Sequence, residues 1–420
     1  MSIRSGAGAA MMRSGLAIRV TFGSALVLTA LIAGPASAIP AGNESRSGVP
    51  DVAPLSATDG VSEAEMADLT TLATQSDQTL ESVIRRYAWN DNFAHIVGVI
   101  RAAWPDDFAG AEISGETSAW VAFRAAAPQG VSEELGALKA IAPDVQVVLR
   151  EGLGLSEIEL LRVIEDVHGL ALNAGGVESA TTTFDYATRT ITTRVLGEKA
   201  APEELSARIR SVVGLANHHL ELVVAPMGSA PGVDSLNYHF GGEALSGACT
   251  TGFGTIGSGV RGISTAGHCG NAQSDDGSAL TYKAGHEGTH GDFQWHTGPK
   301  TEADDFYAGN DTGLEFDLRD VSGIAAPVVG MSLCKNGATN YKDCQEVRSL
   351  NVCTDSLCNL VQMGARLAAG GDSGGPVYWG NTAYGLHQGW MYDPAFPFDR
   401  DVFSRADRID NALGIYIATS

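Results

Sequence analysis

A serine in a glycine-rich turn and a histidine upstream of it could together carry out nucleophilic catalysis. Ser373 lies in Gly-Gly-Asp-Ser-Gly-Gly-Pro at residues 370–376, and His268 lies in Ser-Thr-Ala-Gly-His-Cys at residues 264–269. A serine hydroxyl becomes a good nucleophile only when a neutral imidazole takes its proton. The flanking glycines permit a tight turn that directs the N–H groups of Gly371 and Ser373 at one point, where an oxyanion would form. The two motifs predict a serine peptidase.

The serine motif alone does not separate a peptidase from an esterase. Gly-Asp-Ser-Gly-Gly also fits the Gly-x-Ser-x-Gly pattern of lipases and esterases. Such an esterase needs its histidine after the serine, which leaves only His387, and it needs long helices that this region lacks. His268 before Ser373 therefore favours a peptidase. A serine esterase and a catalytically inactive binding protein are the alternatives.

At these motifs the chain resembles the chymotrypsin-like serine peptidases, in particular the secreted bacterial branch that includes streptogrisins and alpha-lytic protease. Residues 265–269 are similar to the histidine motif of that branch, and residues 371–376 are similar to its serine motif. The resemblance covers about residues 233–420. It implies an all-β fold of two antiparallel six-stranded β-barrels with a C-terminal helix. It also implies a serine endopeptidase without a cofactor, with Gly371 and Ser373 as oxyanion donors.

The catalytic triad of this family needs a carboxylate between the histidine and the serine, and two aspartates are candidates. Asp292 follows His268 closely and precedes Ser373 by a longer interval, as in the bacterial branch, and Asp-Phe-Gln-Trp-His resembles a segment of its members. Asp311 lies in Asn-Asp-Thr-Gly, a sequence typical of a solvated turn. We expect His268 to be the base, Asp292 to orient it and Ser373 to be the nucleophile. Asp311 is the alternative acid.

The acid just before the serine has a structural role in this family, where it pairs with a basic residue and holds the oxyanion loop. Here that acid is Asp372. Bacterial relatives often carry arginine after the first cysteine of the preceding loop, and this chain has Lys335 there. Lysine makes a point-charge contact rather than a planar two-pronged one. The resemblance therefore implies an ion pair between Asp372 and Lys335.

A stretch after the serine lines the specificity pocket in this family. Relatives usually have Ser-Gly-Gly where this chain has Gln388, Gly389 and Trp390, so the indole is expected to narrow the pocket. Leu367 and the three residues after it carry no acid that would select lysine or arginine. The predicted pocket consists of Leu367 together with Gln388, Gly389 and Trp390. An apolar substrate side chain is favoured.

Residues 286–290 match His-Glu-x-x-His, the signature of zinc peptidases. The motif works on a helix, which places His286 and His290 on one face while Glu287 polarises a metal-bound water. Three glycines lie in or beside it, and each would cost a helix about 1 kcal/mol relative to alanine. We therefore expect no metal, and a zinc metallopeptidase is the alternative.

All six cysteines lie at or after residue 249, and an even number in an exported chain favours disulfides. By resemblance, Cys249 with Cys269 would clamp the histidine loop, and Cys334 with Cys344 matches a loop before the serine motif. Cys353 and Cys358 then form a short local bridge without a family counterpart.

Residues 1–38 have the features of a signal peptide. Three arginines precede an apolar stretch at residues 20–33, and small residues in an A-x-A arrangement follow it. The apolar stretch is short and interrupted for a membrane span. We expect a secreted, extracellular protein without stable membrane association.

Residues 39–232 separate this leader from the peptidase part. Their start, to about residue 75, is rich in small and acidic residues and predicts a flexible segment. The stretch from about 80 to 226 predicts a small α+β body, with helical patterns at 80–103, 156–167 and 202–213, strands at 120–123 and 145–149, and a hairpin at 181–195. Ser156 and Glu159 are predicted to form a capping box at the start of the second helical pattern. Its position resembles that of the prosegments that aid folding and inhibit the enzyme in the bacterial branch. A permanent N-terminal domain is the alternative.

Residues 233–420 show short apolar stretches separated by Gly, Asn and Asp, as antiparallel β-barrels do, with one helix expected at about 404–413. The formal net charge of −22 argues against a nucleic-acid partner, which would require a basic patch. We expect protein or peptide substrates, the chain's own prosegment as a partner, and a monomer.

Overall fold

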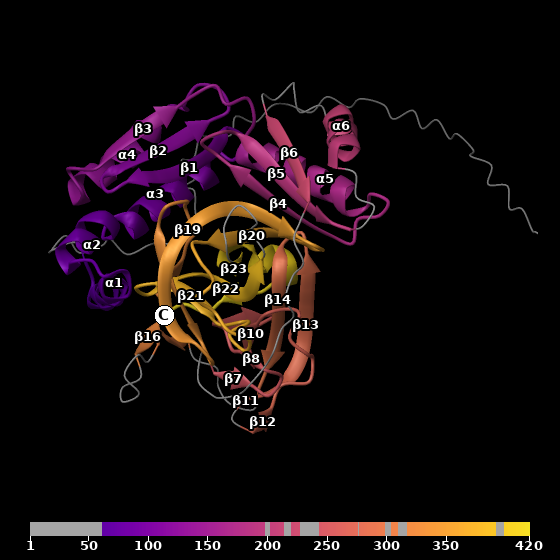
Figure 1. Cartoon of the computed structure of the whole chain (residues 1–420). Coiled ribbons are helices and arrows are strands. Elements are labelled where there is room, and N and C mark those ends of the chain that lie inside the picture. The colour runs from indigo at the N-terminus through magenta and orange to yellow at the C-terminus, as the bar shows by residue number, and fades with distance from the viewer. Residues whose placement is uncertain are drawn as a thin grey trace, which may run out of the picture. The chain divides into compact units, whose positions relative to one another are not determined.

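The computed structural model describes residues 61–197, 202–213, 220–226, 243–275, 277–298, 304–309, 317–391 and 399–420 (Figure 1). The predicted signal peptide at 1–38 lies outside these ranges, and so do residue 233, where the peptidase part was expected to begin, and Asp311. No helix within the ranges is long and apolar enough to cross a membrane.

Three helices come first: α1 (Glu63–Ser76), α2 (Leu80–Tyr87) and α3 (Asn90–Ala103). Helix α1 overturns the predicted flexible start over residues 63–75. Ser62 caps this helix, because its hydroxyl accepts the N–H of Glu65 while the Glu65 carboxylate accepts the N–H of Ser62. Leu69 and Leu72 are buried. Acidic and hydroxyl residues dominate the rest of the helix, so its composition resembles that of a flexible segment.

Two small sheets with helices complete the N-terminal part. In the first, β1 (Phe108–Gly115) is antiparallel to β2 (Ser118–Phe123), which is parallel to β3 (Gln146–Arg150), and α4 (Val131–Ile141) connects β2 to β3. In the second, β4 (Ser179–Asp185) is antiparallel to β5 (Thr190–Leu196), which is parallel to β6 (Glu221–Pro226). Helix α5 (Glu157–Leu172) precedes β4, and α6 (Pro202–Val213) connects β5 to β6. The predicted hairpin and the predicted capping box of Ser156 and Glu159 are both present.

The C-terminal part is mostly β-structure, and six of its strands pair in a closed ring. They are β18 (Ser332–Gly337), β21 (Pro376–Trp379), β22 (Thr382–Met391), β23 (Arg400–Arg405), β20 (Leu357–Met363) and β19 (Tyr341–Thr354) in spatial order. The pairing of β18 with β19 closes the ring. Strand β17 (Gly323–Ile324) runs parallel to β22.

A separate five-stranded sheet has the order β13 (Thr281–Gly288), β14 (Gly291–Thr297), β10 (Val260–Thr265), β9 (Gly254–Gly257) and β24 (Tyr416–Ile417). A second six-stranded ring is not among the pairings of the described residues. Short strands complete this part: β7 (Ala244–Leu245), β8 (Cys249–Thr250), β11 (Ser274–Asp275), β12 (Ser278–Ala279), β15 (Asp305–Tyr307) and β16 (Leu318–Asp320). The expected C-terminal helix is α7 (Ile409–Leu413), which follows a 3₁₀ turn at Ala406–Arg408.

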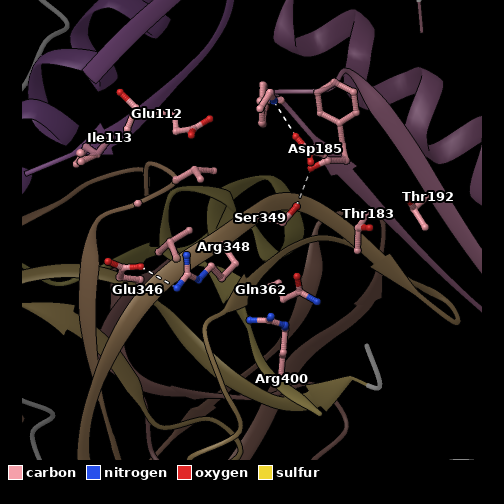
Figure 2. Close-up of a pocket in the computed structure, with 18 of the residues that line it drawn as sticks. Glu112, Ile113, Thr183, Asp185, Thr192, Glu346, Arg348, Ser349, Gln362 and Arg400 are labelled. Atoms are coloured by element: carbon pink, nitrogen blue, oxygen red, sulfur yellow. Dashed lines mark hydrogen bonds and ion pairs between the residues drawn. The ribbon is translucent and has the colours of Figure 1, made fainter. Parts of the chain in front are cut away.

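The N-terminal part is joined to the ring by strand pairing and by buried side chains. Strand β4 pairs with β19 through Thr182 and Cys353, so the second N-terminal sheet extends the sheet of the ring. On α1, the carboxylate of Asp68 is fully buried against Arg319 and Lys342. A cavity of about 550 Å³ lies at this junction, between β1, β4 and β5 on one side and β19, β20 and β23 on the other (Figure 2).

Candidate active site

His268 and Asp292 are brought together by neighbouring strands. His268 comes shortly after β10, and Asp292 is the second residue of β14, which pairs with β10. One carboxylate oxygen of Asp292 accepts the Nδ1–H of the imidazole at 2.6 Å, and the other accepts the backbone N–H of His268 at 2.9 Å. The Asp292 side chain is 0% exposed and that of His268 is 38% exposed. A buried acid therefore fixes the tautomer and the orientation of an accessible imidazole.

This contact also changes the affinity of the imidazole for a proton. Burial by itself lowers the pKa of His268, but the hydrogen bond and the charge of Asp292 outweigh it, so the pKa is raised above its ordinary value. The imidazole becomes a stronger base through its Nε2 atom.

Three further residues position the pair, and the sequence did not single them out. Ser404 on β23 accepts the backbone N–H of Asp292 at 2.9 Å. Gln294, on the same strand as Asp292, donates to the carbonyl of Gly267 at 2.8 Å. A Cβ at Gly267 would lie 2.4 Å from the Asp292 carboxylate, so only glycine fits before the histidine. The sequence could have indicated Gln294, because it follows Asp292 by two residues and residues two apart on a strand share a face.

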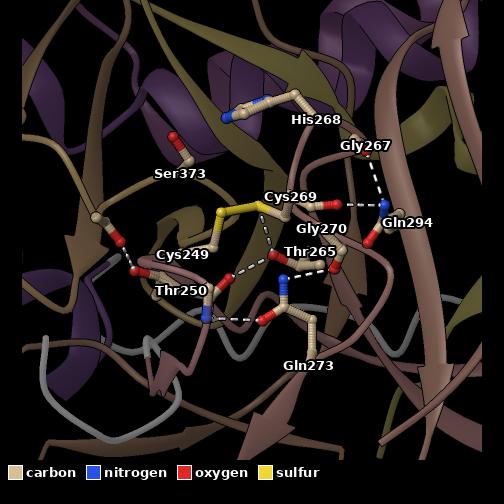
Figure 3. Close-up of a disulfide and its surroundings, with 12 residues drawn as sticks. Cys249, Thr250, Thr265, Gly267, His268, Cys269, Gly270, Gln273, Gln294 and Ser373 are labelled. Atoms are coloured by element: carbon tan, nitrogen blue, oxygen red, sulfur yellow. Dashed lines mark hydrogen bonds between the residues drawn. A yellow bond between two sulfur atoms is a disulfide. The ribbon is translucent and has the colours of Figure 1, made fainter. Parts of the chain in front are cut away.

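Ser373 lies in a turn that the rest of the chain holds from several sides. Its carbonyl accepts the N–H of Thr250 at 2.7 Å, and the N–H of Gly374 donates to the carbonyl of His387 at 2.6 Å. Gly374 has φ of 92°, and a Cβ there would meet Thr265 at 2.1 Å. The Ser373 hydroxyl donates to the carbonyl of Gln388 at 3.1 Å. Figure 3 shows Ser373 and His268 beside the Cys249–Cys269 disulfide.

The N–H groups of Gly371 and Ser373 share their peptide groups with the carbonyls of Gly370 and Asp372. Both carbonyls accept hydrogen bonds from the protein. The carbonyl of Gly370 accepts the Thr339 hydroxyl at 2.9 Å, and the carbonyl of Asp372 accepts the N–H of Gly375 at 3.0 Å. In a trans peptide the N–H points opposite to the carbonyl. Neither N–H has a partner among the described residues. Gly371 has φ of 103°, which disfavours other residues.

Asp372 and Lys335 form the pair that the resemblance implied. The Lys335 ammonium lies 2.9 Å from the fully buried Asp372 carboxylate, which also accepts the N–H groups of Ala369, Thr339 and Asn340. Burial acts to raise the pKa of Asp372, but the charge of Lys335 and the N–H of Ala369 outweigh that effect and hold the pKa below its ordinary value. The pair therefore keeps the turn before Ser373 in one conformation.

The predicted pocket residues lie on two sides of an acid that the sequence did not reveal. Leu367 donates its N–H to the carboxylate of Asp401 at 2.8 Å. Trp390 pairs in register with Asp401 and is covered by the guanidinium of Arg366, 3.6 Å from its ring centre. Gln388 and Gly389 precede Trp390 on β22.

The His-Glu-x-x-His segment forms the end of β13 and the turn into β14 rather than a helix. The rings of His286 and His290 are stacked with centres 5.6 Å apart, and His286 Nε2 accepts the backbone N–H of His290. The helical face that the zinc motif requires is therefore not formed.

The six cysteines form the three predicted disulfides: Cys249–Cys269, Cys334–Cys344 and Cys353–Cys358. Cys249, His268 and Cys269 also lie close enough to suggest a metal site within the described residues. Because both sulfur atoms are in a disulfide, they cannot act as thiolate ligands.

Comparison with known proteins identifies relatives of this chain. No family model matches. The chain is 31% identical over 164 residues to glutamyl endopeptidase 2 of Streptomyces griseus, covering 36% of this chain and 84% of the relative. It is 30% identical over 165 residues to serine protease 1 of Streptomyces fradiae, covering 36% of this chain and 44% of the relative.

Among solved structures, Cellulomonas bogoriensis chymotrypsin is 23% identical and matches with a TM-score of 0.35, covering 44% of this chain and all of that one. The match to the Streptomyces griseus peptidase extends over most of that protein. The chain therefore belongs to the chymotrypsin-like serine peptidases and is a serine endopeptidase.

Proposed function

We propose that Ser373, His268 and Asp292 carry the peptidase reaction, with the N–H groups of Gly371 and Ser373 as oxyanion donors. The observation that carries this proposal is the double contact of Asp292 with the imidazole and the backbone of His268. A carboxylate that bonds only the imidazole would allow the ring to swing. The second bond, to the backbone, fixes the carboxylate relative to the chain that carries the ring.

In the first half of the reaction, the Ser373 hydroxyl leaves the carbonyl of Gln388 and gives its proton to Nε2 of His268. The serine oxygen bonds to the substrate carbonyl carbon, and the negative oxygen that results is stabilised by the two N–H groups. The C–N bond breaks as His268 protonates the leaving amine. Water then attacks the acyl-enzyme with the same base and releases the acid and free Ser373.

A fluorophosphonate tests this assignment against the metal and esterase alternatives. The active protein obtained from the full chain should be labelled on Ser373, with loss of peptidase activity in proportion to the label. Ser373→Ala should abolish both the label and the activity. A chelator such as 1,10-phenanthroline should have no effect. Chelator-sensitive activity without labelling would revive a zinc mechanism at His286 and His290. Labelling with hydrolysis of esters but not of peptides would favour the esterase.

We also propose that the protein is made as a secreted precursor, with a signal peptide at 1–38, a prosegment at 39–232 and the peptidase domain at 233–420. The α+β body of the N-terminal part and its strand pairing with β19 support a prosegment that aids folding and inhibits the enzyme. Mass spectrometry of the active extracellular form should give a mature N-terminus near residue 233. An active form that retains residues 61–226 would favour a permanent N-terminal domain.

The closed ring and the separate five-stranded sheet support a peptidase domain of two six-stranded barrels. A crystal structure of the mature enzyme would test this architecture, and sedimentation of the same sample would test the expected monomer.

The substrates proposed are proteins and peptides. Leu367 and Trp390 favour an apolar side chain in the pocket, whereas the name of the Streptomyces griseus relative points to glutamate. A peptide library that varies the residue before the cleaved bond distinguishes the two preferences.

A further inference from the structure

Asp401 is a buried acid between the two stretches proposed to line the substrate pocket. On one side it pairs in strand register with Trp390, and on the other its carboxylate accepts the N–H groups of Leu367 at 2.8 Å and Ala368 at 3.1 Å. Only 1% of Asp401 is exposed. The carboxylate therefore contacts one wall of the proposed pocket directly, and its residue is the strand partner of the other wall.

His387 lies on β22, and its imidazole is close to the Asp401 carboxylate. Its Nε2 lies 3.8 Å from Asp401, and neither ring nitrogen has a hydrogen-bond partner among the described residues. The backbone of His387 is bonded to Gly374 and Gly375, next to Ser373. A cavity of about 10 Å³, lined in part by Asp401 and Lys335, adjoins the ring and has room for about one water molecule.

The charges around this pair are mainly negative. Lys335 contacts Asp372 at 2.9 Å and Asp343 at 3.6 Å, so one lysine faces three carboxylates when Asp401 is included. Burial raises the pKa of Asp343 to about 6. Above that pH the negative charges therefore outnumber the positive ones, even with an imidazolium at His387.

Asp401 itself keeps its charge. Burial acts to raise its pKa, but the imidazole of His387 and the N–H of Leu367 offset this, and the pKa stays below its ordinary value. Two neighbouring arginines bond other groups, although the guanidinium of Arg366 lies over the Trp390 ring. Arg400 lines the junction cavity (Figure 2), and Arg366 pairs with Asp399.

This arrangement decides which substrate side chains fit. A glutamate or aspartate side chain in the pocket would approach a buried group of like charge, and such a juxtaposition costs several kcal/mol. A lysine or arginine would gain little, because the Asp401 carboxylate already accepts the N–H groups of Leu367 and Ala368 and the side-chain amide of Gln345 at 2.9 Å. A neutral side chain avoids both costs.

We propose that Asp401 makes this peptidase selective for neutral side chains and against glutamate and aspartate, in contrast to its glutamyl endopeptidase relative. The proposal rests on the proposed function, because it assumes that Leu367 and Trp390 line the pocket of Ser373.

Cleavage of matched peptides with leucine or glutamate before the scissile bond tests the proposal in the enzyme obtained from the full chain. The wild type should have a kcat/KM for leucine at least about 100-fold above that for glutamate. Asp401→Asn should raise the glutamate-to-leucine ratio about 10-fold, because it removes one buried charge. His387→Gln should not raise the glutamate-to-leucine ratio. If Asp401→Asn acted only by disturbing the packing around the pocket, His387→Gln should change the ratio in the same direction.

Asp410→Asn, an exposed position on α7, is the matched control and should leave the ratio unchanged. If Asp401→Asn does not fold, Asp343→Asn removes a less buried charge of the same group and should raise the ratio by a smaller factor. A wild-type preference for glutamate, or an unchanged ratio in the folded Asp401 or Asp343 variant, overturns the proposal. Fluorophosphonate labelling of Ser373 separates this failure from failure of the proposed function, because the label requires only the nucleophile and its base.

Discussion

Two aspartates with fully buried carboxylates are compensated in different ways. Asp292 is bonded by the imidazole and the backbone N–H of His268, and both residues belong to the C-terminal part. Asp68, on α1 in the N-terminal part, is bonded by Arg319 at 3.0 Å and Lys342 at 2.7 Å in the C-terminal part. The first carboxylate keeps its partners if the two parts separate, and the second loses them.

The difference shows which charges are permanent and which depend on the junction. Burying a charge is tolerated only when it is paired and hydrogen-bonded. The site of His268 satisfies this within one part of the chain, so its geometry does not require the N-terminal part. Separation would leave Arg319 and Lys342 with Asp317 as their remaining acid, because both also contact that residue.

The largest expected effect is on turnover when Asp292 is replaced. Asp292→Asn should lower kcat by about 10⁴-fold, because the amide no longer holds His268 in the required tautomer. Asp68→Asn in the full chain should leave the kcat of the active enzyme obtained from it unchanged, because Asp68 lies in the proposed prosegment. Turnover of one peptide substrate, normalised to active enzyme by active-site titration, measures both. An Asp292→Asn enzyme with near-normal turnover would instead direct attention to Asp311.

A smaller effect is expected where a buried ion pair lies within the C-terminal part. Lys335→Met leaves Asp372 without its cation, and removing one partner of a buried pair costs about 3 kcal/mol of unfolding free energy or more. Lys335→Arg should recover most of the loss, since it restores the charge. Urea unfolding of both variants in a Ser373→Ala background, which prevents self-digestion, gives the two values. Equal losses for Met and Arg would mean that shape, rather than charge, matters at this position.

At the junction the corresponding loss should be smaller. Asp68→Ala removes the partner of Arg319 and Lys342, but Asp317 remains, so we expect about 2 kcal/mol. Hydrogen exchange at the backbone N–H groups of α1 in the Ser373→Ala full chain measures this loss, whereas the N–H of Gly380 loses its acceptor directly in the variant. Asp77→Asn, at the exposed end of the same helix, is the control. Unchanged protection of α1 in the Asp68→Ala chain would show that apolar contacts alone hold it in place.

The sequence predicted those features that depend on neighbouring residues or on a family motif. The turn at Ser373 and the cap of α5 at Ser156 are local patterns, and the disulfides were predicted from proximity and resemblance. Asp292 was chosen over Asp311 by spacing and resemblance alone. The contact of Asp292 with His268, by contrast, requires the pairing of β10 with β14, which no local pattern specifies.

The features that the sequence did not predict depend on strand register or on burial by distant segments. Asp401 lies opposite Trp390 only because β22 and β23 pair in one register, and a shift of one residue would turn its side chain to the other face. Helix α1 was missed because Leu69 and Leu72 become buried only in the folded chain, where α1 meets the C-terminal part. The pairing of β4 with β19 is likewise invisible before folding.

A buried carboxyl at the junction, that of Asp91, should make the stability of the chain depend on pH. Asp91 on α3 accepts the hydroxyl of Tyr384, and burial raises its pKa to about 7, with the nearby Glu65 adding to that effect. Between about pH 4 and pH 7, the Asp91 carboxyl is therefore protonated in the folded chain and ionised in the unfolded one. The stabilisation from this proton is complete below about pH 4 and is lost as the pH rises to 7, at about 1.4 kcal/mol per pH unit.

Asp91→Asn keeps a neutral group of the same shape, so it should flatten this dependence and change the acidic limit little. Unfolding free energies of the Ser373→Ala chain and of its Asp91→Asn derivative, compared at each pH from 4 to 8, isolate the effect from that of other groups. The two curves should meet at pH 4 and diverge toward pH 7, with the asparagine variant the more stable. Parallel curves would mean that Asp91 is ionised in the folded chain. The junction would then depend on charge pairing at Asp68 alone, and not also on a carboxyl that must stay protonated.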